Sequence, residues 1–479
     1  MSVETITLGC RLNFAESETI ARSAPAGEDW VVVNSCAVTN EAVRQTRQAI
    51  RKAKRARPGA RVIVTGCAAQ VEPEMFAAMP EVSRVIGNRE KWFAENFTAT
   101  VRAEPVEALP FRLGEREQKT GLRQARAERS LGFGASVPDI RVSDIMQVRE
   151  TAPHLAAGFA ERSRAFVEVQ NGCDHRCTFC IIPFGRGNSR SVPAGLVIER
   201  IAALVAEGFG EVVLTGVDVT SYGPDLPGAP TLGQLIERIL RHVPALPRLR
   251  LSSLDCIEMD ERLFELATGE PRFMPHFHMS FQAGDDMILK RMKRRHSRRD
   301  AIDTVARLKA RRPQIAIGAD LIAGFPTETD AMAENSLRLV EECDIVMGHI
   351  FPYSPKRGTP AARMPQVPPA IAKLRARALR EACARRKAAW LADMVGTRQR
   401  VLVEKDGRGH AENFAPVQLK PSPSMGEALG GGGGSGQAPP FIDATPPQPL
   451  SIKGRGLDGA IVETLIVGVE AGTLIGAPL

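Results

Sequence analysis

Between about residues 164 and 352, the sequence repeats a short apolar run followed by a stretch with helical periodicity. The apolar runs that we expect to be strands are Ala165–Val169, Val212–Thr215, Leu249–Ser252, Phe277–Phe281, Ile315–Asp320 and Val346–Phe351. Helical patterns follow them, as over Ala194–Glu207, Leu232–Arg241 and Asp300–Ala310. Strands that alternate with helices form parallel sheets, because each parallel connection needs a crossover. Six such units predict a complete or partial (β/α) barrel, with a doubly wound sheet as the alternative.

The N-terminal segment shows the same alternation on a smaller scale. We expect strands over Thr5–Leu8, Trp30–Val33 and Arg61–Val64, and helices over Asn13–Ala24, Glu41–Arg57 and Glu72–Met79. This pattern predicts a separate parallel α/β domain over residues 1–102. The charge-rich stretch 103–137, which contains Pro105 and Pro110, has no sustained periodicity, so we interpret residues 103–140 as a linker or insertion.

The C-terminal part has a different pattern. A long basic helix is expected over residues 370–395, and it would end a central domain that spans residues 141–395. After it, Gln399–Val403, Ala415–Leu419 and Ala460–Val467 are typical of strands, which predicts a small all-β domain over residues 396–479. A Pro/Ser/Gly-rich stretch at about 420–450 includes Gly430–Gly434 and is expected to be a flexible loop.

Three cysteines lie within eight residues directly after the first strand of the central domain. The segment reads Gln170-Asn-Gly-Cys173-Asp-His-Arg-Cys177-Thr-Phe-Cys180, a C-x3-C-x2-C spacing. Three thiolates on one loop can hold three irons of a cubane cluster, whose usual complement is four cysteines. The fourth iron would stay open, as a catalytic metal site requires. The alternative is a zinc knuckle that also uses His175, although zinc ribbons more often have paired C-x2-C units.

A second set of three cysteines, Cys10, Cys36 and Cys67, is spread over nearly sixty residues, and each follows an expected strand. The carboxyl ends of parallel strands lie at one edge of a sheet, where ligands bind. We therefore expect these three thiols to converge and hold a second cluster. The alternative is three separate buried cysteines, which is how we interpret Cys256, Cys343 and Cys383.

The C-x3-C-x2-C loop, with Phe179 before its last cysteine, resembles the radical S-adenosylmethionine (SAM) superfamily. The resemblance implies that Cys173, Cys177 and Cys180 hold a catalytic [4Fe–4S] cluster whose open iron chelates SAM, and that reductive cleavage of SAM yields a 5′-deoxyadenosyl radical. Other strand ends match this family in the same order along the chain. The resemblance implies SAM contacts from Phe179, Thr215, Gly216, Ser252, Gln282 and Asp320.

The combination of both cysteine sets resembles the methylthiotransferases, and this likeness extends over nearly the whole chain except the two inserts. It implies an N-terminal domain with an auxiliary [4Fe–4S] cluster held by Cys10, Cys36 and Cys67, a partial radical SAM barrel and a TRAM-like β-barrel. It further implies that the auxiliary cluster carries the sulfur and that SAM serves as both methyl donor and radical source. A reductant such as flavodoxin or ferredoxin is implied as a partner.

Members of this family modify an adenosine next to the tRNA anticodon or an aspartate of a ribosomal protein. Several stretches are most similar to the branch that acts on N6-threonylcarbamoyladenosine in tRNA, at adenine C2. They are Asn34-Ser-Cys-Ala-Val-Thr39, Thr65-Gly-Cys-Ala-Ala-Gln70 and His349-Ile-Phe-Pro-Tyr-Ser-Pro-Lys-Arg-Gly-Thr-Pro360. Two alternatives remain: the same chemistry on another modified adenosine or a ribosomal protein, and a non-catalytic protein that binds zinc and RNA.

The net positive charge and the basic stretches of the sequence are consistent with an RNA partner. The formal net charge is +8, and Arg44–Arg57, Lys290–Arg299 and Lys373–Lys387 each contain seven Lys or Arg residues. Such stretches bind phosphates, although each could also be a solvated helix face. The sequence has neither the pattern of a signal peptide nor a run of about 18 apolar residues, so we expect a cytoplasmic protein without a membrane partner.

Overall fold

The computed structural model describes residues 3–23, 29–97, 139–149, 163–420 and 457–479. These residues form an N-terminal sheet, a central barrel-like sheet and a C-terminal closed barrel. The segment 103–137 and nearly all of 420–450, where we expected inserts, lie outside the described residues. No helix within the described ranges combines the length and apolar character needed to cross a membrane.

The N-terminal part is a five-stranded sheet in which every pairing is parallel and the strand order is β1-β2-β3-β4-β5. Its strands are β1 (Glu4–Thr7), β2 (Trp30–Ser35), β3 (Arg61–Gly66), β4 (Arg84–Ile86) and β5 (Asp139–Arg141). Its helices are α1 (Arg11–Ser23), α2 (Asn40–Ala56), α3 (Cys67–Val71) and α4 (Pro73–Ala77). The central strands β2 and β3 are almost fully buried, as expected for near-continuous apolar runs covered on both faces.

The N-terminal sheet extends beyond residue 102, where we expected its domain to end. β5 pairs with β4 over three residues, although 41 residues lie between it and the preceding described helix. Only Ile140 among those three residues is apolar, and it is exposed. The sequence therefore offers no periodic signal for this strand.

The central part contains two four-stranded sheets, β7-β6-β8-β9 and β10-β11-β12-β13. Its strands are β6 (Arg164–Asn171), β7 (Arg190–Ser191), β8 (Glu211–Gly216), β9 (Leu249–Leu251), β10 (Ser253–Leu254), β11 (His276–Gln282), β12 (Ala316–Ala323) and β13 (Ile345–Pro352). Its helices are α5 (Ile182–Arg186), α6 (Ala194–Ala206), α7 (Leu232–His242), α8 (Glu261–Gly269), α9 (Asp286–Met292), α10 (Arg298–Arg311) and α11 (Asp330–Glu342).

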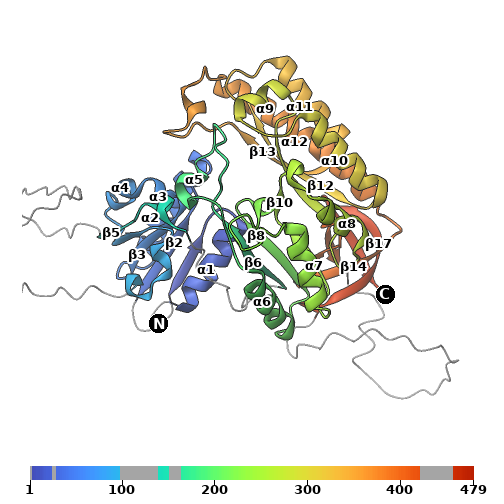
Figure 1. Cartoon of the computed structure of the whole chain (residues 1–479), viewed down its shortest axis with the longest axis horizontal. Helices are drawn as coiled ribbons and strands as arrows, with labels where there is room; N and C mark the ends of the chain where they lie inside the picture. The colour runs from blue at the N-terminus through green and yellow to red at the C-terminus, as the bar shows by residue number, and fades with distance from the viewer. Residues whose placement is uncertain (1–2, 24–28, 98–138, 150–162, 421–456) are drawn as a thin grey trace, which may run out of the picture.

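Together the two central sheets form one curved wall, because β9 and β10 are separated only by Ser252. Apart from the short antiparallel strand β7, the order β6, β8, β9/β10, β11, β12, β13 follows the chain without reversal. A doubly wound sheet would reverse its order at a switch point, so the structure is the partial barrel. Helices α6, α7, α8, α10 and α11 lie outside the strands (Figure 1), and the largest apolar core fills the layer between them.

Helix α12 (Pro369–Ala392) leads into the C-terminal closed barrel, whose strand order is β14-β15-β16-β18-β17. Its strands are β14 (Arg398–Lys405), β15 (Arg408–His410), β16 (Pro416–Leu419), β17 (Ile461–Glu470) and β18 (Thr473–Pro478). Three of them match the expected strands, while β15 and β18 were not expected. The small all-β domain is therefore confirmed, and it is a closed barrel of five strands.

The C-terminal barrel covers the amino ends of the central strands. Phe414 lies 5.1 Å from the Arg164 guanidinium and 4.8 Å from that of Arg250, and it stacks on His276 at 5.0 Å. Arg250 also binds both carboxylate oxygens of Glu211, the first residue of β8, at 3.0 Å. Because ligands bind at the carboxyl ends of barrel strands, this contact leaves that opposite edge free for a site.

Candidate active site

Cys10, Cys36 and Cys67 come together at the carboxyl edge of the N-terminal sheet, as the sequence predicts. Cys10 follows β1, Cys36 follows β2 directly, and Cys67 begins α3 directly after β3. Gly9 has φ +100°, and a Cβ built there would lie 2.7 Å from the Cβ and 3.0 Å from the Sγ of Cys36. A residue with a side chain would therefore clash with Cys36, so Gly9 allows the chain to bring Cys10 beside it.

The pKa values of these thiols reflect their proximity. Burial raises the pKa of Cys36 to about 12, and the charges of Cys67 and Cys10 raise it further. Burial also raises the pKa of Cys10, and Cys67 adds to that effect. Neighbouring thiolates repel one another, so these thiols lose their protons readily only when a metal takes the place of the protons. Three cysteines placed in this way are therefore suited to hold a cluster.

The loop with the other three cysteines is fixed by backbone hydrogen bonds. The Cys173 N–H donates to the Gly187 carbonyl at 3.0 Å, and the Cys180 N–H donates to the Cys177 carbonyl at 3.1 Å. The Thr178 N–H donates to the Met292 carbonyl at 3.1 Å, which ties the loop to α9. Burial raises the pKa of Cys180 to about 12, with a further contribution from Cys177. The thiols of this set therefore also lie close enough to influence one another.

His175, the possible fourth ligand of a zinc knuckle, is engaged by carboxylates instead. Its Nε2 lies 2.9 Å from Asp218 and 3.6 Å from Glu258. These hydrogen bonds raise the pKa of His175 to about 10, although the Arg295 guanidinium, 2.8 Å from the same Nε2, acts to lower it. His175 is therefore held by polar side chains of the central part, beside the cysteine loop.

Helix α5, which begins two residues after Cys180, connects the two cysteine sets. Figure 1 shows α5 between the N-terminal sheet and the central strands. A Cβ built on Gly185 would lie 3.2 Å from the Cβ of Cys67, and the Arg186 Nε donates to the Cys67 Sγ at 3.1 Å. The charge of Cys67 also raises the pKa of Cys180. Cys67 of the first set therefore lies against the helix that follows the second set, across the domain boundary.

Arg186 belongs to a buried charge network that the sequence did not predict. Its guanidinium binds Glu16 and Asn13 of α1, and Glu16 also pairs with Lys91 at 2.7 Å. The side chains of Arg186, Glu16 and Lys91 are at most 2% exposed. Although burial acts to raise it, the two cations hold the pKa of Glu16 at about 2. Buried charges need partners of this kind, and no sequence pattern signals which distant residues supply them.

The expected SAM-contact residues lie along the central strands. Thr215 and Gly216 end β8, Ser252 separates β9 from β10, and Gln282 ends β11 in a left-handed conformation with φ +66°. The Ser252 hydroxyl is buried and has no hydrogen-bond partner among the described residues. Phe179 packs edge-on against Phe325 with ring centroids 6.3 Å apart.

Asp320, the remaining expected SAM contact, lies in the middle of β12 between two histidines. Its Oδ1 lies 3.0 Å from the Nε2 of His278 on β11 and 3.4 Å from the Nδ1 of His349 on β13. Although burial acts to raise it, the two histidines hold the pKa of the Asp320 carboxyl well below its usual range. The carboxylate is therefore ionised and already partnered inside the protein.

Comparison with known proteins decides the family. The Radical SAM superfamily pattern matches residues 167–340, and the Uncharacterized protein family UPF0004 pattern matches residues 2–87. The threonylcarbamoyladenosine tRNA methylthiotransferase MtaB of Rickettsia prowazekii is 48% identical over 426 residues, which cover 88% of this chain and 93% of that protein. The chain belongs to the radical SAM tRNA methylthiotransferase family.

Relatives with another named substrate are also similar to this chain. The tRNA-2-methylthio-N(6)-dimethylallyladenosine synthase of Maricaulis maris is 32% identical over 84% of this chain and 86% of its own length. Among solved structures, the radical SAM methyltransferase TsrM of Kitasatospora setae has a TM-score of 0.50 at 16% identity, over 72% of this chain and 66% of that chain. That likeness concerns the fold alone.

This protein is therefore a radical SAM enzyme that uses SAM and iron–sulfur clusters to methylthiolate tRNA. The non-catalytic zinc and RNA-binding protein that we considered as an alternative is wrong. The methylthiotransferase family and the three-part architecture that the sequence predicted are confirmed.

Many cations of the three basic stretches are occupied within the protein. Arg44 pairs with Glu41, and Arg57 with Glu4 and Asp29. Similar ion pairs involve Arg294, Arg295, Arg298, Arg299, Arg375, Arg377 and Arg386. The count of seven cations per stretch therefore overstates the charge that is available to a tRNA phosphate backbone.

Proposed function

We propose that this methylthiotransferase attaches a methylthio group to adenine C2 of the N6-threonylcarbamoyladenosine next to the tRNA anticodon. The name of the Rickettsia prowazekii relative, at 48% identity, supports this substrate. The more distant relatives named for dimethylallyladenosine are 31–33% identical, so they support that substrate less. We place the reaction in the cytoplasm, where tRNA is found.

The observation that carries this proposal is the meeting of the two cysteine sets through α5. Cys173, Cys177 and Cys180 would hold the cluster that binds SAM, and Cys10, Cys36 and Cys67 would hold a second cluster that carries the sulfur. The crowded thiols of each set and the cation of Arg186 beside Cys67 suit an anionic cluster. When bound, the clusters and SAM supply the radical, the sulfur and the methyl group.

The chain itself would position SAM through the strand ends. We propose that the unpartnered Ser252 hydroxyl and the Gln282 amide bind polar groups of SAM, and that Thr215 and Gly216 border it. Phe179 and Asp320 would complete this contact set. A Cβ on Gly216 would lie 2.6 Å from the Gln170 carbonyl, so a larger residue there would displace β8 from β6.

The proposed substrate is tested by nucleoside mass spectrometry of tRNA from cells that lack this protein. We expect the 2-methylthio derivative of threonylcarbamoyladenosine to disappear, its unmethylthiolated precursor to accumulate, and the wild-type gene to reverse both changes. If the 2-methylthio derivative of dimethylallyladenosine disappeared instead, the substrate assignment would be wrong. A mass change confined to a ribosomal protein would favour the ribosomal alternative.

A further inference from the structure

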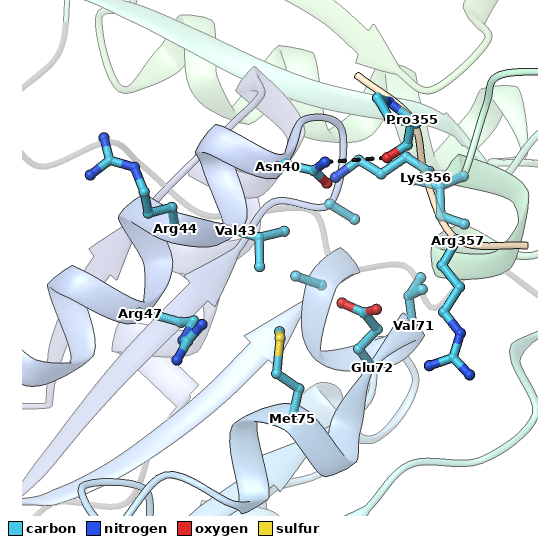
Figure 2. A pocket seen from close by; sticks show the side chains of 13 residues that line it. Asn40, Val43, Arg44, Arg47, Val71, Glu72, Met75, Pro355, Lys356 and Arg357 are labelled. Atoms are coloured by element: carbon cyan, nitrogen blue, oxygen red, sulfur yellow. Dashed lines mark hydrogen bonds between the residues drawn. The ribbon is translucent and has the colours of Figure 1, made fainter. Parts of the chain in front are cut away.

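A groove of about 370 Å³ lies between α2, α3, α4 and the Pro355–Arg357 segment that follows β13. Figure 2 shows Arg44 and Arg47 on one side, Pro355, Lys356 and Arg357 on the other, and Glu72 and Met75 between them. The Asn40 side chain donates to the Pro355 carbonyl at 3.2 Å, which joins the two walls. The groove is therefore formed jointly by the N-terminal and central parts.

The groove borders both cysteine sets. Among its lining residues are Ala37, Ala68 and Ile181, which directly follow Cys36, Cys67 and Cys180. Lys356, which also lines the groove, is buried. An occupant of the groove would therefore lie against residues adjacent to cysteines of both sets.

The groove combines free positive charge with an apolar floor. Arg47 and Arg357 are exposed, and neither has an ion pair with any described residue. Glu72 is the one acidic residue among those that line the groove, and Arg44 is paired with Glu41. Val43, Val71, Met75 and Ile181 supply apolar surface. Cations above an apolar floor suit a ligand that has both phosphates and a flat base.

We propose that this groove binds a nucleotide of the tRNA anticodon strand immediately beside the target adenosine. Its base would lie against Val43, Val71 and Met75, and its flanking phosphates would contact Arg47 and Arg357. The proposal rests on the tRNA substrate proposed above and adds where the strand enters the site. The cavity volume falls within the range of about 300–1,000 Å³ that small-ligand sites span.

The test compares two double variants of the full holoenzyme. Arg47→Gln with Arg357→Gln removes both free cations of the groove. Arg307→Gln with Arg311→Gln removes two exposed arginines from the outer helix α10, where both lie over the Phe264 ring. The probe is an anticodon stem–loop RNA that carries threonylcarbamoyladenosine, and affinity is measured across a salt series.

The groove variant should bind the RNA at least tenfold more weakly at 100 mM salt. Its slope of log K against log salt should be less steep by about 2, because each lost phosphate contact removes about 1. The α10 variant should match the wild type. Unchanged binding by the groove variant, or an equal loss in both variants, would overturn the proposal.

Photo-crosslinking locates the nucleotide directly. A 4-thiouridine placed next to the target adenosine should crosslink to α2, α3, α4 or the Pro355–Arg357 segment in the wild type. Crosslinks confined to other elements would overturn the groove assignment. Methylthiolation of the same RNA is measured separately. If the wild type crosslinks through the groove but never modifies the RNA, the proposed function is contradicted and the groove assignment is not.

Discussion

At the residue scale, one buried guanidinium of the central part binds three residues of the N-terminal part. Arg186 donates to Cys67 at 3.1 Å and also binds Glu16 and Asn13. We predict that Arg186→Lys loses iron from the N-terminal cluster, because an ammonium group cannot bind all three partners at once. The measurement is iron and sulfide content in a chain whose Cys173, Cys177 and Cys180 are replaced by Ala, where the parent should retain about four irons.

Arg250→Lys is the matched control for this change, because Arg250 is equally buried and pairs with Glu211 away from the cysteines. Both variants should lose folding stability, by up to about 3–5 kcal/mol where a buried pair is broken. Only the Arg186 variant should lose iron. Retention of about four irons by Arg186→Lys would refute the proposed support of the N-terminal cluster.

The cysteines themselves give the second prediction at this scale. The wild type should contain about eight irons, and replacing Cys173, Cys177 and Cys180 with Ala should halve that number and abolish SAM cleavage. Replacing Cys10, Cys36 and Cys67 should also halve the iron but leave formation of 5′-deoxyadenosine intact, while methylthio product is lost. Normal product from the latter variant would contradict the sulfur-carrier role.

The site residues that sequence reasoning found are those with a positional signal. Cysteines that follow three successive strands must meet at one sheet edge, whatever the details of packing. Arg186, Glu16 and Lys91 carry no such signal, since they are far apart in the chain and meet only through tertiary packing. The composition of a charged stretch likewise does not reveal which of its cations are paired.

At the element scale, strands with continuous apolar runs were predictable, and several short strands were not. β2, β3, β8 and β12 contain continuous apolar runs and agree with the expected strands within a few residues. β4, β5 and β15 have only three residues each, too few to show a period. These short strands form because a neighbouring strand of the sheet pairs with them. A local sequence pattern carries no information about that neighbour.

The first residue of β8 gives a pH-dependent prediction. Although burial acts to raise it, Arg250 and Arg164 hold the pKa of Glu211 at about 2, below its usual value of 4.5. Because the folded-state pKa is lowered, this carboxylate stabilises the protein above about pH 4.5, and the stabilisation is lost as the pH falls toward 2. Glu211→Gln should therefore cost about 3 kcal/mol at pH 7 and progressively less below pH 4.5.

Urea denaturation of the wild type and Glu211→Gln from pH 7 to pH 3 measures this effect. The exposed pair of Glu237 with Arg262 supplies a control, because Glu237→Gln breaks an ion pair at the surface and should leave stability nearly unchanged at every pH. If the difference in unfolding free energy between the wild type and Glu211→Gln stayed constant down to pH 3, packing, and not charge, would explain the loss of stability.

At the scale of the whole molecule, the C-terminal barrel is packed into the central domain. Arg164 pairs with Glu404 at 2.7 Å, and Arg248 donates to the Arg400 carbonyl at 2.8 Å. Truncation before residue 398 would expose these buried arginines and remove Phe414 from His276. We therefore expect the truncated chain to bind tRNA more weakly and also to melt at a lower temperature, with the cluster ligands still present.

The C-terminal barrel and the segment 421–450 within its sequence should contribute differently to tRNA binding. The segment 421–450 contains no Lys or Arg, so it offers no cation to a phosphate. Its deletion keeps β16, β17 and their neighbours, and should leave tRNA affinity and its salt dependence unchanged. Truncation before residue 398 should instead reduce affinity and make the salt slope less steep, because the cations of β14 and β15 are lost with the barrel. A salt series of tRNA affinities on both deletions decides this, and full affinity without the C-terminal barrel would show that the other two parts bind tRNA by themselves.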